Sequence, residues 1–376
     1  MADIKIVDFA LQSAQGDLKE SIAAIKQGNI SSASKTVLMQ DEEMVIPYFL
    51  LKDEVEDSFD TIYAAMKRVV SASLVSLDEE KKRKTALLVG TSLIDDNLVQ
   101  AVESTLYEYK KQPYSSKKRS IDSFGKDLAD ELGLNPFTMT ISTACTSSVN
   151  AILEAKNLIE SGLFEYVVVV GLEVSSFMMS SGFSSMKLLS NTSQKPFDKN
   201  RDGLVLGEAI AAVLIGEGDS PWIIKGGYSN CNSVNITSVS PSGEEYVEVM
   251  QKALQESGVK SEEITALKAH ATSTPTNDLS EINAIAKLFD KSLTFTALKP
   301  YTGHTLGACG ALEVALFLGS LDDGFIPKTI GHSEPIIDGY QPLLQEKRFE
   351  GEGSFMLNYF GFGGNNTSLI IQRSLS

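Results

Sequence analysis

Short apolar, β-branched runs alternate with segments of helical periodicity along most of this 376-residue chain. The runs predicted as strands are residues 4–7, 85–89, 137–143, 166–170 and 210–215, and several more follow Trp222. Strands that alternate with helices are typical of an α/β fold, in which helices cover the faces of a sheet. The chain is long enough for one large α/β unit built from two halves.

Cys145 lies where the predicted strand at 137–143 ends and a helix-like segment at 149–161 begins. A cysteine at such a junction is close to free backbone N–H groups and to the positive end of the helix. Both favour the thiolate, which is the nucleophilic form. The alternative is a small packing residue, because free cysteines are among the most buried residues. Taken alone, the position of Cys145 leaves both interpretations open.

The same order of elements recurs later in the chain. Residues 293–298 are predicted as a strand, 299–307 as a turn and 308–318 as a helix rich in Ala and Leu. A connection rich in glycine and proline lies at 216–222. We therefore predict a duplication, with an N-terminal half at 1–218 that carries Cys145 and a C-terminal half at 219–376.

Composition limits the partners and the compartment. The formal net charge is −16, which argues against nucleic acid or an anionic membrane as the main partner. The cysteines are only three, at wide spacing, and they predict neither a disulfide framework nor a metal site. No apolar run reaches 18 residues, and the first residues lack the pattern of a signal peptide. We expect a cytoplasmic protein.

Two of the three histidines, His270 and His304, lie in segments rich in glycine or threonine that directly follow predicted strands. Such loops can hold a polar ligand close to the backbone. Each histidine by itself would more often be a hydrogen-bonded structural residue. Their meaning therefore depends on the motifs around them.

Five segments resemble, in order, the motifs of the β-ketoacyl-acyl carrier protein synthases, the condensing enzymes of the thiolase superfamily. These segments are residues 143–148, 195–208, 270–281, 299–310 and 358–366. The resemblance spans residues 135–372, and five motifs in one order are hard to obtain by chance. It implies a five-layered α-β-α-β-α thiolase fold made of two duplicated halves, with both histidines in the C-terminal half.

The resemblance also implies a reaction. Cys145 would take an acyl group from a carrier-protein thioester, and malonyl carrier protein would then decarboxylate and attack that acyl-enzyme. His270 and His304 would donate N–H groups to the enolate oxygen. The backbone N–H groups of Cys145 and Phe360 would form the oxyanion hole. No permanently bound cofactor is implied, since the substrates are carried on the phosphopantetheine of the acyl carrier protein.

Other family positions are also matched. Lys299 would be a buried cation held by the carboxylates of Glu281 and Glu313, because an unpaired buried charge is very costly. The residues expected to bind the phosphopantetheine arm are Thr272, Thr274 and, on a weaker match, Thr237. The glycine-rich gating loop is expected to comprise Phe360, Gly361, Phe362, Gly363 and Gly364. Cys309 stands where the family usually has alanine, and we expect it to be a packing residue.

Rival functions fit less well. A thiolase needs a second catalytic cysteine near the C-terminus, where this chain has residues 360–364, and the initiating condensing enzymes use Asn where His304 stands. A non-catalytic chain-length-determining subunit typically loses its nucleophile, whereas Cys145, His270, His304 and Lys299 are all present. We predict a catalytic β-ketoacyl synthase of fatty-acid or specialised polyketide or polyene synthesis. The chain-length-determining subunit is the alternative.

The resemblance further implies dimerisation through the N-terminal half, either as a homodimer or with a related synthase-like subunit. The acyl carrier protein, itself acidic, would need a local basic surface on this acidic chain. The two candidate docking patches are residues 81–84 and the cluster Lys110, Lys111, Lys117, Lys118 and Arg119.

Overall fold

A mixed β-sheet forms the centre of the computed structural model, which describes residues 3–39, 42–52, 59–93, 121–232 and 239–375. Its strands from the first half of the chain are β1 (Lys5–Ser13), β2 (Gly16–Asp17), β5 (Thr85–Gly90), β6 (Thr138–Ile141), β7 (Tyr166–Glu173) and β9 (Ala209–Gly216). Those from the second half are β10 (Trp222–Cys231), β11 (Ile264–Lys268), β12 (Phe295–Thr296), β15 (Gly353–Phe360) and β16 (Asn365–Arg373). All the strands predicted in the first half are present.

The two halves have the same strand topology. In the first half the lateral order is β6-β5-β7-β9-β1, and in the second it is β12-β11-β15-β16-β10. If the five main strands of each half are numbered in chain order, without the short β2, both lateral orders are 3-2-4-5-1. The pairings also match, since β5 and β11 each lie between two parallel neighbours while the other pairs are antiparallel. Within the main sheet, the halves are joined where β1 pairs with β10, at Lys5 and Ile223. The duplicated α/β architecture is confirmed.

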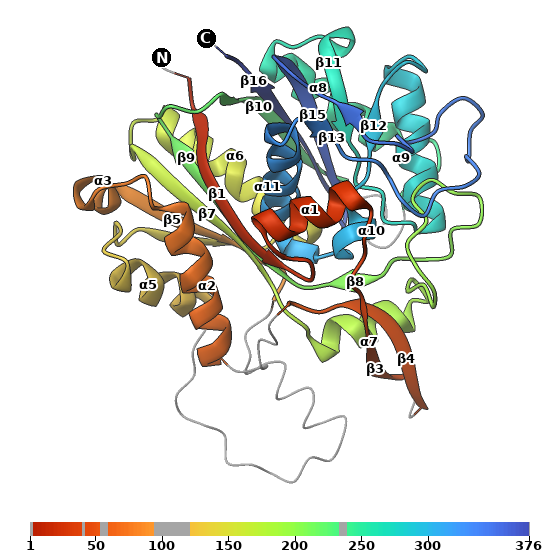
Figure 1. Cartoon of the computed structure of the whole chain (residues 1–376), viewed down its shortest axis with the longest axis horizontal. Coiled ribbons are helices and arrows are strands. Elements are labelled where there is room, and N and C mark those ends of the chain that lie inside the picture. The colour runs from red at the N-terminus through yellow and green to blue at the C-terminus, as the bar shows by residue number, and fades with distance from the viewer. Residues whose placement is uncertain (1–2, 40–41, 53–58, 94–120, 233–238, 376) are drawn as a thin grey trace.

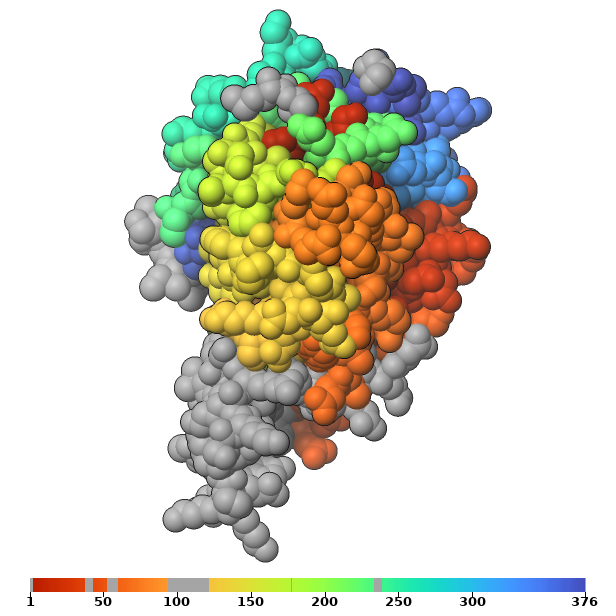
Figure 2. Space-filling view, turned by 90° about the vertical axis from the view of Figure 1, so that its left-hand side faces the viewer, coloured from red at the N-terminus to blue at the C-terminus, as the bar shows by residue number. Residues whose placement is uncertain are grey.

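Helices divide this architecture into layers (Figure 1). The central layer consists of α6 (Ser147–Glu160) and α11 (Cys309–Asp322), which pack against each other, and α6 contacts strands of both halves. Outer helices of the first half are α2 (Phe59–Ser73), α3 (Glu79–Arg83) and α5 (Ile121–Glu131), on the face shown in Figure 2. Outer helices of the second half are α8 (Glu244–Ser257) and α9 (Pro275–Leu288). Residues 309–321 of α11 are all buried, as a helix between two sheet layers requires.

Smaller elements complete the fold. A three-stranded sheet contains β3 (Ala33–Met39), β4 (Glu42–Phe49) and β8 (Leu206–Gly207), and a short pair contains β13 (Phe325–Ile326) and β14 (Lys347–Arg348). The remaining helices are α1 (Leu18–Gln27), α7 (Phe177–Ser185) and α10 (Lys299–Thr302). Within the described ranges, no helix is both long and apolar enough to cross a membrane.

The two central helices approach each other so closely that glycine is needed at the contact. A Cβ atom on Gly310 would lie 2.3 Å from the backbone nitrogen of Val149. The Ser148 hydroxyl bridges the same contact, since it donates to the Gly307 carbonyl and accepts from the Ala311 N–H. The crossing therefore sets how the two halves meet.

We expect Gly310→Ala to lower the free energy of unfolding by about 1–3 kcal/mol, because the added methyl group forces backbone atoms apart. Urea unfolding followed by circular dichroism measures this change. Gly182→Ala in α7 is the matched control, since a Cβ there meets nothing within 4 Å, and it should leave stability unchanged or slightly higher. Equal effects of the two substitutions would contradict the tight crossing.

Candidate active site

Cys145 lies at a strained turn between β6 and α6. The turn is a short 3₁₀ segment, Ala144–Thr146, and Ala144 has a positive φ of 55°. The second half has the same device before α11, where Leu306 has φ 41° at the start of the segment Leu306–Ala308. Non-glycine residues at positive φ are uncommon and are often found at functional sites. The paired turns bring the starts of α6 and α11 together, and with them Cys145 and His304.

The Cys145 thiol contacts His304 directly. Its Sγ lies 3.1 Å from the His304 Nε2 atom, and only 2% of the Cys145 residue surface is exposed. Burial raises the pKa of Cys145 to about 11, although the Phe362 N–H and the Lys299 charge act in the opposite direction. The prediction that the surroundings favour a thiolate is therefore wrong for the resting protein, because desolvation outweighs the helix terminus. The resting thiol is neutral and needs a base, and His304 is in position to act as one.

His270 has a defined tautomer. Lys299 Nζ lies 3.3 Å from His270 Nδ1, and an ammonium group can only donate hydrogen bonds. Although burial disfavours the cation, the Glu313 carboxylate raises the pKa of Lys299, so the group stays charged. Nδ1 therefore accepts, and Nε2 carries the proton. That Nε2–H group is buried and has no hydrogen-bond partner among the described residues.

Both active-site histidines are neutral. Burial and the nearby Lys299 cation hold the pKa of His270 and that of His304 well below the ordinary value. Their ring centroids are 5.2 Å apart, and the rings are nearly perpendicular. Two neutral imidazoles in this arrangement can donate N–H groups to one oxygen atom that gains negative charge.

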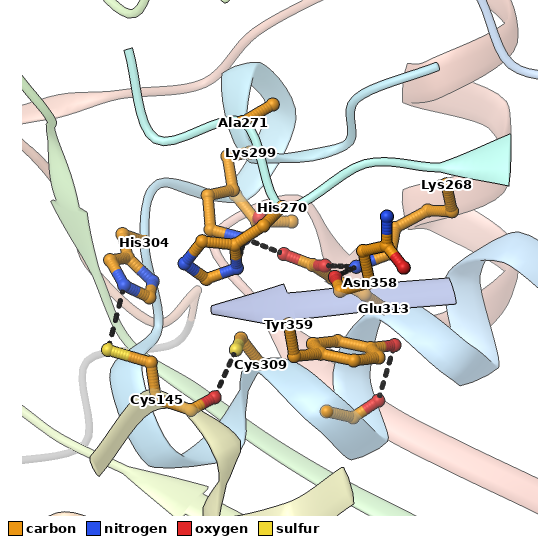
Figure 3. Close-up of polar contacts among 12 residues, drawn as sticks. Cys145, Lys268, His270, Ala271, Lys299, His304, Cys309, Glu313, Asn358 and Tyr359 are labelled. Carbon is orange, nitrogen blue, oxygen red and sulfur yellow. Dashed lines mark hydrogen bonds and ion pairs between the residues drawn. The ribbon is translucent and has the colours of Figure 1, made fainter. Parts of the chain in front are cut away.

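A buried charge cluster supports the histidines (Figure 3). Glu313 accepts from Lys299 Nζ at 2.7 Å through one carboxylate oxygen, as the sequence predicted. Its other oxygen accepts from Lys268, a residue that sequence analysis did not identify. The sequence does contain a signal for Lys268. It is a charged residue in an otherwise apolar predicted strand, and it lies two residues before His270, so an extended chain places both side chains on the same face.

Glu281 has a different role from the predicted one. Its carboxylate accepts the backbone N–H groups of His270 and Ala271, both at 2.7 Å, and no ion pair joins it to Lys299. Asp278, which was also missed, accepts the N–H of Ser273 at 3.0 Å. Ala271 and Ser273 both have positive φ. The two carboxylates of α9 thus hold a strained loop that presents His270.

A narrow cleft with an accessible volume of about 70 Å³ leads to the histidines. Thr272 and Thr274, predicted to bind the phosphopantetheine arm, line it, and their hydroxyl groups lie 3.0 Å apart. Thr237, the weaker prediction, lies outside the described residues. The rest of the wall includes apolar side chains such as Leu188 and Leu204.

The predicted gating loop forms the other side of the cleft, with residues 360–364 all in its wall. A Cβ atom on Gly364 would lie 2.0 Å from the Asn232 carbonyl oxygen, so this position requires glycine. The Phe362 ring packs edge-on against Phe183 of α7, with 5.5 Å between ring centroids. The loop therefore closes against α7 beside the thiol.

The oxyanion-hole assignment needs a correction. The backbone N–H groups that reach the Cys145 sulfur are those of Cys145 and Phe362. Phe360 instead lies within β15, opposite Asn366 of β16, and stacks on Tyr246. The chain leaves the strand after Phe360, so the amide that turns toward the thiol is that of Phe362. Cys145 and Phe362 are therefore the donors that the geometry favours, in place of Cys145 and Phe360.

Cys309 is buried as expected for a packing residue, and it also makes a specific contact. Its thiol donates to the carbonyl oxygen of Cys145 at 3.0 Å. Burial raises the pKa of Cys309, so the thiol is protonated and can donate. This contact links the start of α11 to the backbone of the nucleophile.

Comparison with known proteins agrees with this geometry. The family model described as Beta-ketoacyl synthase, N-terminal domain, matches residues 51–220, and the one described as Beta-ketoacyl synthase, C-terminal domain, matches residues 222–333. This chain belongs to the β-ketoacyl synthase family. As a β-ketoacyl synthase it is a condensing enzyme of the acyltransferase class.

Relatives of this β-ketoacyl synthase cover most of its length. The chloroplastic 3-oxoacyl-[acyl-carrier-protein] synthase I of Arabidopsis thaliana is 31% identical over 81% of this chain and 70% of its own length. The 3-oxoacyl-[acyl-carrier-protein] synthase 2 of Vibrio cholerae is 28% identical over 82% of this chain and 81% of its own.

A solved structure of the ketosynthase ApeO in complex with its chain length factor ApeC, from Xenorhabdus doucetiae, superposes on this β-ketoacyl synthase with a TM-score of 0.84. The match has 25% identity and covers 99% of this chain and 98% of the other. The ishigamide ketosynthase/chain length factor, at 21% identity and a TM-score of 0.85, shares the fold over 100% of this chain and 99% of its own. The predicted thiolase-like fold is confirmed.

Proposed function

We propose that Cys145 accepts an acyl group from a carrier-protein thioester and that malonyl carrier protein, after decarboxylation, attacks this acyl-enzyme. The observation that carries the proposal is the 3.1 Å contact between Cys145 Sγ and His304 Nε2, beside a His270 Nε2–H group that has no partner among the described residues. His304 is positioned as a base for the Cys145 nucleophile. His270 provides a hydrogen-bond donor that has no partner among the described residues.

In the first step the Cys145 sulfur attacks the thioester carbonyl while His304 Nε2 takes the thiol proton. Negative charge on the carbonyl oxygen is stabilised by the N–H groups of Cys145 and Phe362. The intermediate collapses, the bond to the phosphopantetheine sulfur breaks, and that sulfur leaves with the proton from His304. The acyl group is then on Cys145, and His304 is neutral again.

In the second step the bond between the malonyl carboxylate and the α-carbon breaks, carbon dioxide leaves, and the electron pair forms an enolate. His270 donates its Nε2–H group to the enolate oxygen, and His304, which no longer faces a thiol proton once Cys145 is acylated, donates in its Nε2–H tautomer. The enolate carbon then attacks the Cys145 thioester, and the bond to sulfur breaks. The Cys145 thiolate that departs takes up one proton from solvent, which restores the neutral thiol, and a β-ketoacyl carrier protein leaves.

The cleft suits the phosphopantetheine arm, whose amides match the short hydroxyl side chains of Thr272 and Thr274. We expect Thr274→Val to raise KM for an acyl carrier protein about fivefold with kcat within a factor of two, because one neutral hydrogen bond is lost. Steady-state kinetics measure both constants. Thr265→Val in β11, outside the cleft, is the control. A fall in kcat with unchanged KM would contradict this role.

The same set of residues favours a catalytic subunit over a chain-length-determining one. The nucleophile, both histidines and Lys299 are all present and in contact.

The relatives named 3-oxoacyl-[acyl-carrier-protein] synthases support fatty-acyl substrates. The solved complex of a ketosynthase with a chain length factor supports a specialised polyketide or polyene pathway and a related partner subunit. Cytoplasmic location remains a prediction.

Intact-mass analysis after incubation with several acyl carrier proteins tests the proposal. An acyl adduct should form on the wild-type chain and should be absent from Cys145→Ala, with Cys231→Ala as the control because that thiol, unlike the buried Cys145, is exposed. The mass of the adduct names the acyl group. No adduct from any carrier, together with a changed product length when the chain is mixed with another synthase, would favour the non-catalytic alternative.

We further propose a dimer that forms through the N-terminal half. Strand β6 lies at one end of the sheet order, and all four of its residues are partly exposed. Next to it Phe137 is 36% exposed, and Leu163 is 66% exposed. Among the described residues this strand edge is unpaired and partly apolar, and such an edge is a surface that a second chain can extend. Light scattering of the purified protein gives the oligomeric state.

The first candidate patch for carrier-protein docking has local acidic partners. In α3 Lys82 pairs with Glu79, and Lys84 just beyond pairs with Glu80 and Glu165. These ion pairs reduce the positive potential that residues 81–84 can offer to an acidic partner. The second candidate, residues 110–119, lies outside the described residues, and carrier-protein docking remains a prediction.

A further inference from the structure

Lys268 is a buried cation next to the catalytic residues. It is the last residue of β11, two positions before His270, and it is completely buried. Its Nζ donates to Glu313 and to the Asn358 carbonyl oxygen, the latter at 2.7 Å, and it lies 3.5 Å from the centre of the Tyr359 ring. These contacts suit an ammonium group and leave it no path to the substrate cleft.

The charges around Lys268 do not balance. Lys268 and Lys299 approach the two oxygens of the single Glu313 carboxylate from different sides (Figure 3). The other buried carboxyl group of the cluster, Glu281, is already used by backbone N–H groups of the His270 loop. Burial raises the pKa of Glu281 to about 7, which weakens it further as a counter-charge. The cluster therefore has one ammonium group more than Glu313 can neutralise.

A surplus buried cation is costly for folding, and an apolar side chain of similar size would usually be as stable or more stable. Its retention here points to a function. The groups that face Lys268 are Glu313 and Cys309 of α11, Tyr359 of β15, Lys299 of α10, and His270 and Glu281 beyond the strand end. None of these other than Glu313 is an anion that pairs with it directly.

We propose that Lys268 is a positioning residue for the condensation. By occupying one oxygen of Glu313, Lys268 keeps Lys299 from being fully neutralised and leaves its ammonium group directed at His270 Nδ1. The surplus positive charge keeps both histidines in the neutral form that donates N–H groups, and it favours the anionic enolate. This inference rests on the condensation proposed above.

The sign of the effect follows from the charges. The positive charge of Lys268 lowers the pKa of both His270 and His304, behind the larger effects of burial and of Lys299. Removal of that charge raises the pKa of each histidine. If the neutral histidines are the active forms, the acid limb of the rate profile moves to higher pH.

The test compares Lys268→Met with the wild type and with Lys252→Met, which removes an exposed lysine of α8. Decarboxylation of malonyl carrier protein is measured from pH 5 to pH 8, and folding is measured by urea unfolding. For Lys268→Met we expect an acid limb shifted upward by about one pH unit, so that the rate falls by up to about tenfold on the acid side of the wild-type limb and is unchanged above both limbs, with native stability or better. Lys252→Met should match the wild type.

Nitrogen-15 NMR gives a second readout, because the chain has only three histidines. In Lys268→Met, His270 and His304 should become protonated at higher pH than in the wild type, while His332 serves as the internal reference. Lys268→Gln, which retains a donor for Asn358 but has no charge, should shift the acid limb in the same way.

Each outcome is decisive. An unshifted acid limb in folded Lys268→Met, with unchanged histidine signals, would overturn the inference while leaving the proposed condensation intact. Failure of both Lys268→Met and Lys268→Gln to fold would assign Lys268 a purely structural role, and would also overturn it. Absence of decarboxylation and of acyl adducts in the wild type itself would instead refute the proposed function.

Discussion

Glu313→Gln should lower the free energy of unfolding by about 3–5 kcal/mol at pH 7, because it removes the carboxylate that two buried ammonium groups share. The loss should be smaller near pH 10. Without Glu313 the folded chain favours neutral lysines, whereas the unfolded chain keeps them protonated up to about pH 10.4. Between the two pKa values the unfolded state binds more protons, so the stability of the variant rises with pH.

Urea unfolding at pH 7 and pH 10 measures this effect. Glu248→Gln, which breaks an exposed pair with Lys252, is the control and should change stability by less than about 0.5 kcal/mol. If Glu313→Gln behaved like Glu248→Gln, the buried cluster would not be charged as described.

His270→Ala and His304→Ala should separate the two steps of the reaction. His304 contacts the thiol, whereas His270 does not, so only His304→Ala should strongly slow acylation of Cys145. We expect a loss of about 10²–10⁴-fold in acylation for His304→Ala and less than about tenfold for His270→Ala. Both should slow malonyl decarboxylation by about 10²–10³-fold, because each removes a donor to the enolate oxygen.

Single-turnover acylation, followed by intact mass, and conversion of malonyl to acetyl carrier protein measure the two steps. His332→Ala is the matched control, because His332 bonds to the Pro196 carbonyl outside the cleft. Equal losses of acylation in His270→Ala and His304→Ala would contradict the assignment of His304 as the base for Cys145.

Much of the fold could be predicted from the sequence. Buried strands contain unbroken apolar runs, such as the four valines at 167–170, and the turns before α6 and α11 follow strands in the same order in both halves. These are local patterns, and local patterns suffice for element type and order. The grouping of Cys145, His270 and His304 in one site also followed once motifs from the two halves were combined.

What could not be predicted depends on contacts between distant segments. The raised pKa of Cys145 comes from burial by the whole fold, which no local motif reports. The choice between Phe360 and Phe362 as oxyanion donor depends on the residue at which the backbone leaves β15. Sequence patterns do not locate the end of a strand to within two residues. Lys268 could be noticed as a charge in an apolar strand, but its role could not be predicted because its partner, Glu313, is 45 positions away in the sequence. Glu281 was assigned the wrong partner for a similar reason, since it bonds to amides rather than to a cation.

The similar turns before α6 and α11 have different catalytic functions in the two duplicated halves. Both halves retain the same strained bend, but one half uses it to present a thiol and the other a base. Neither half contains all the catalytic residues, so a complete active site forms only where the two halves contact each other. Turnover therefore reports assembly of the whole chain, and a molecule with two well-folded but undocked halves would be inert.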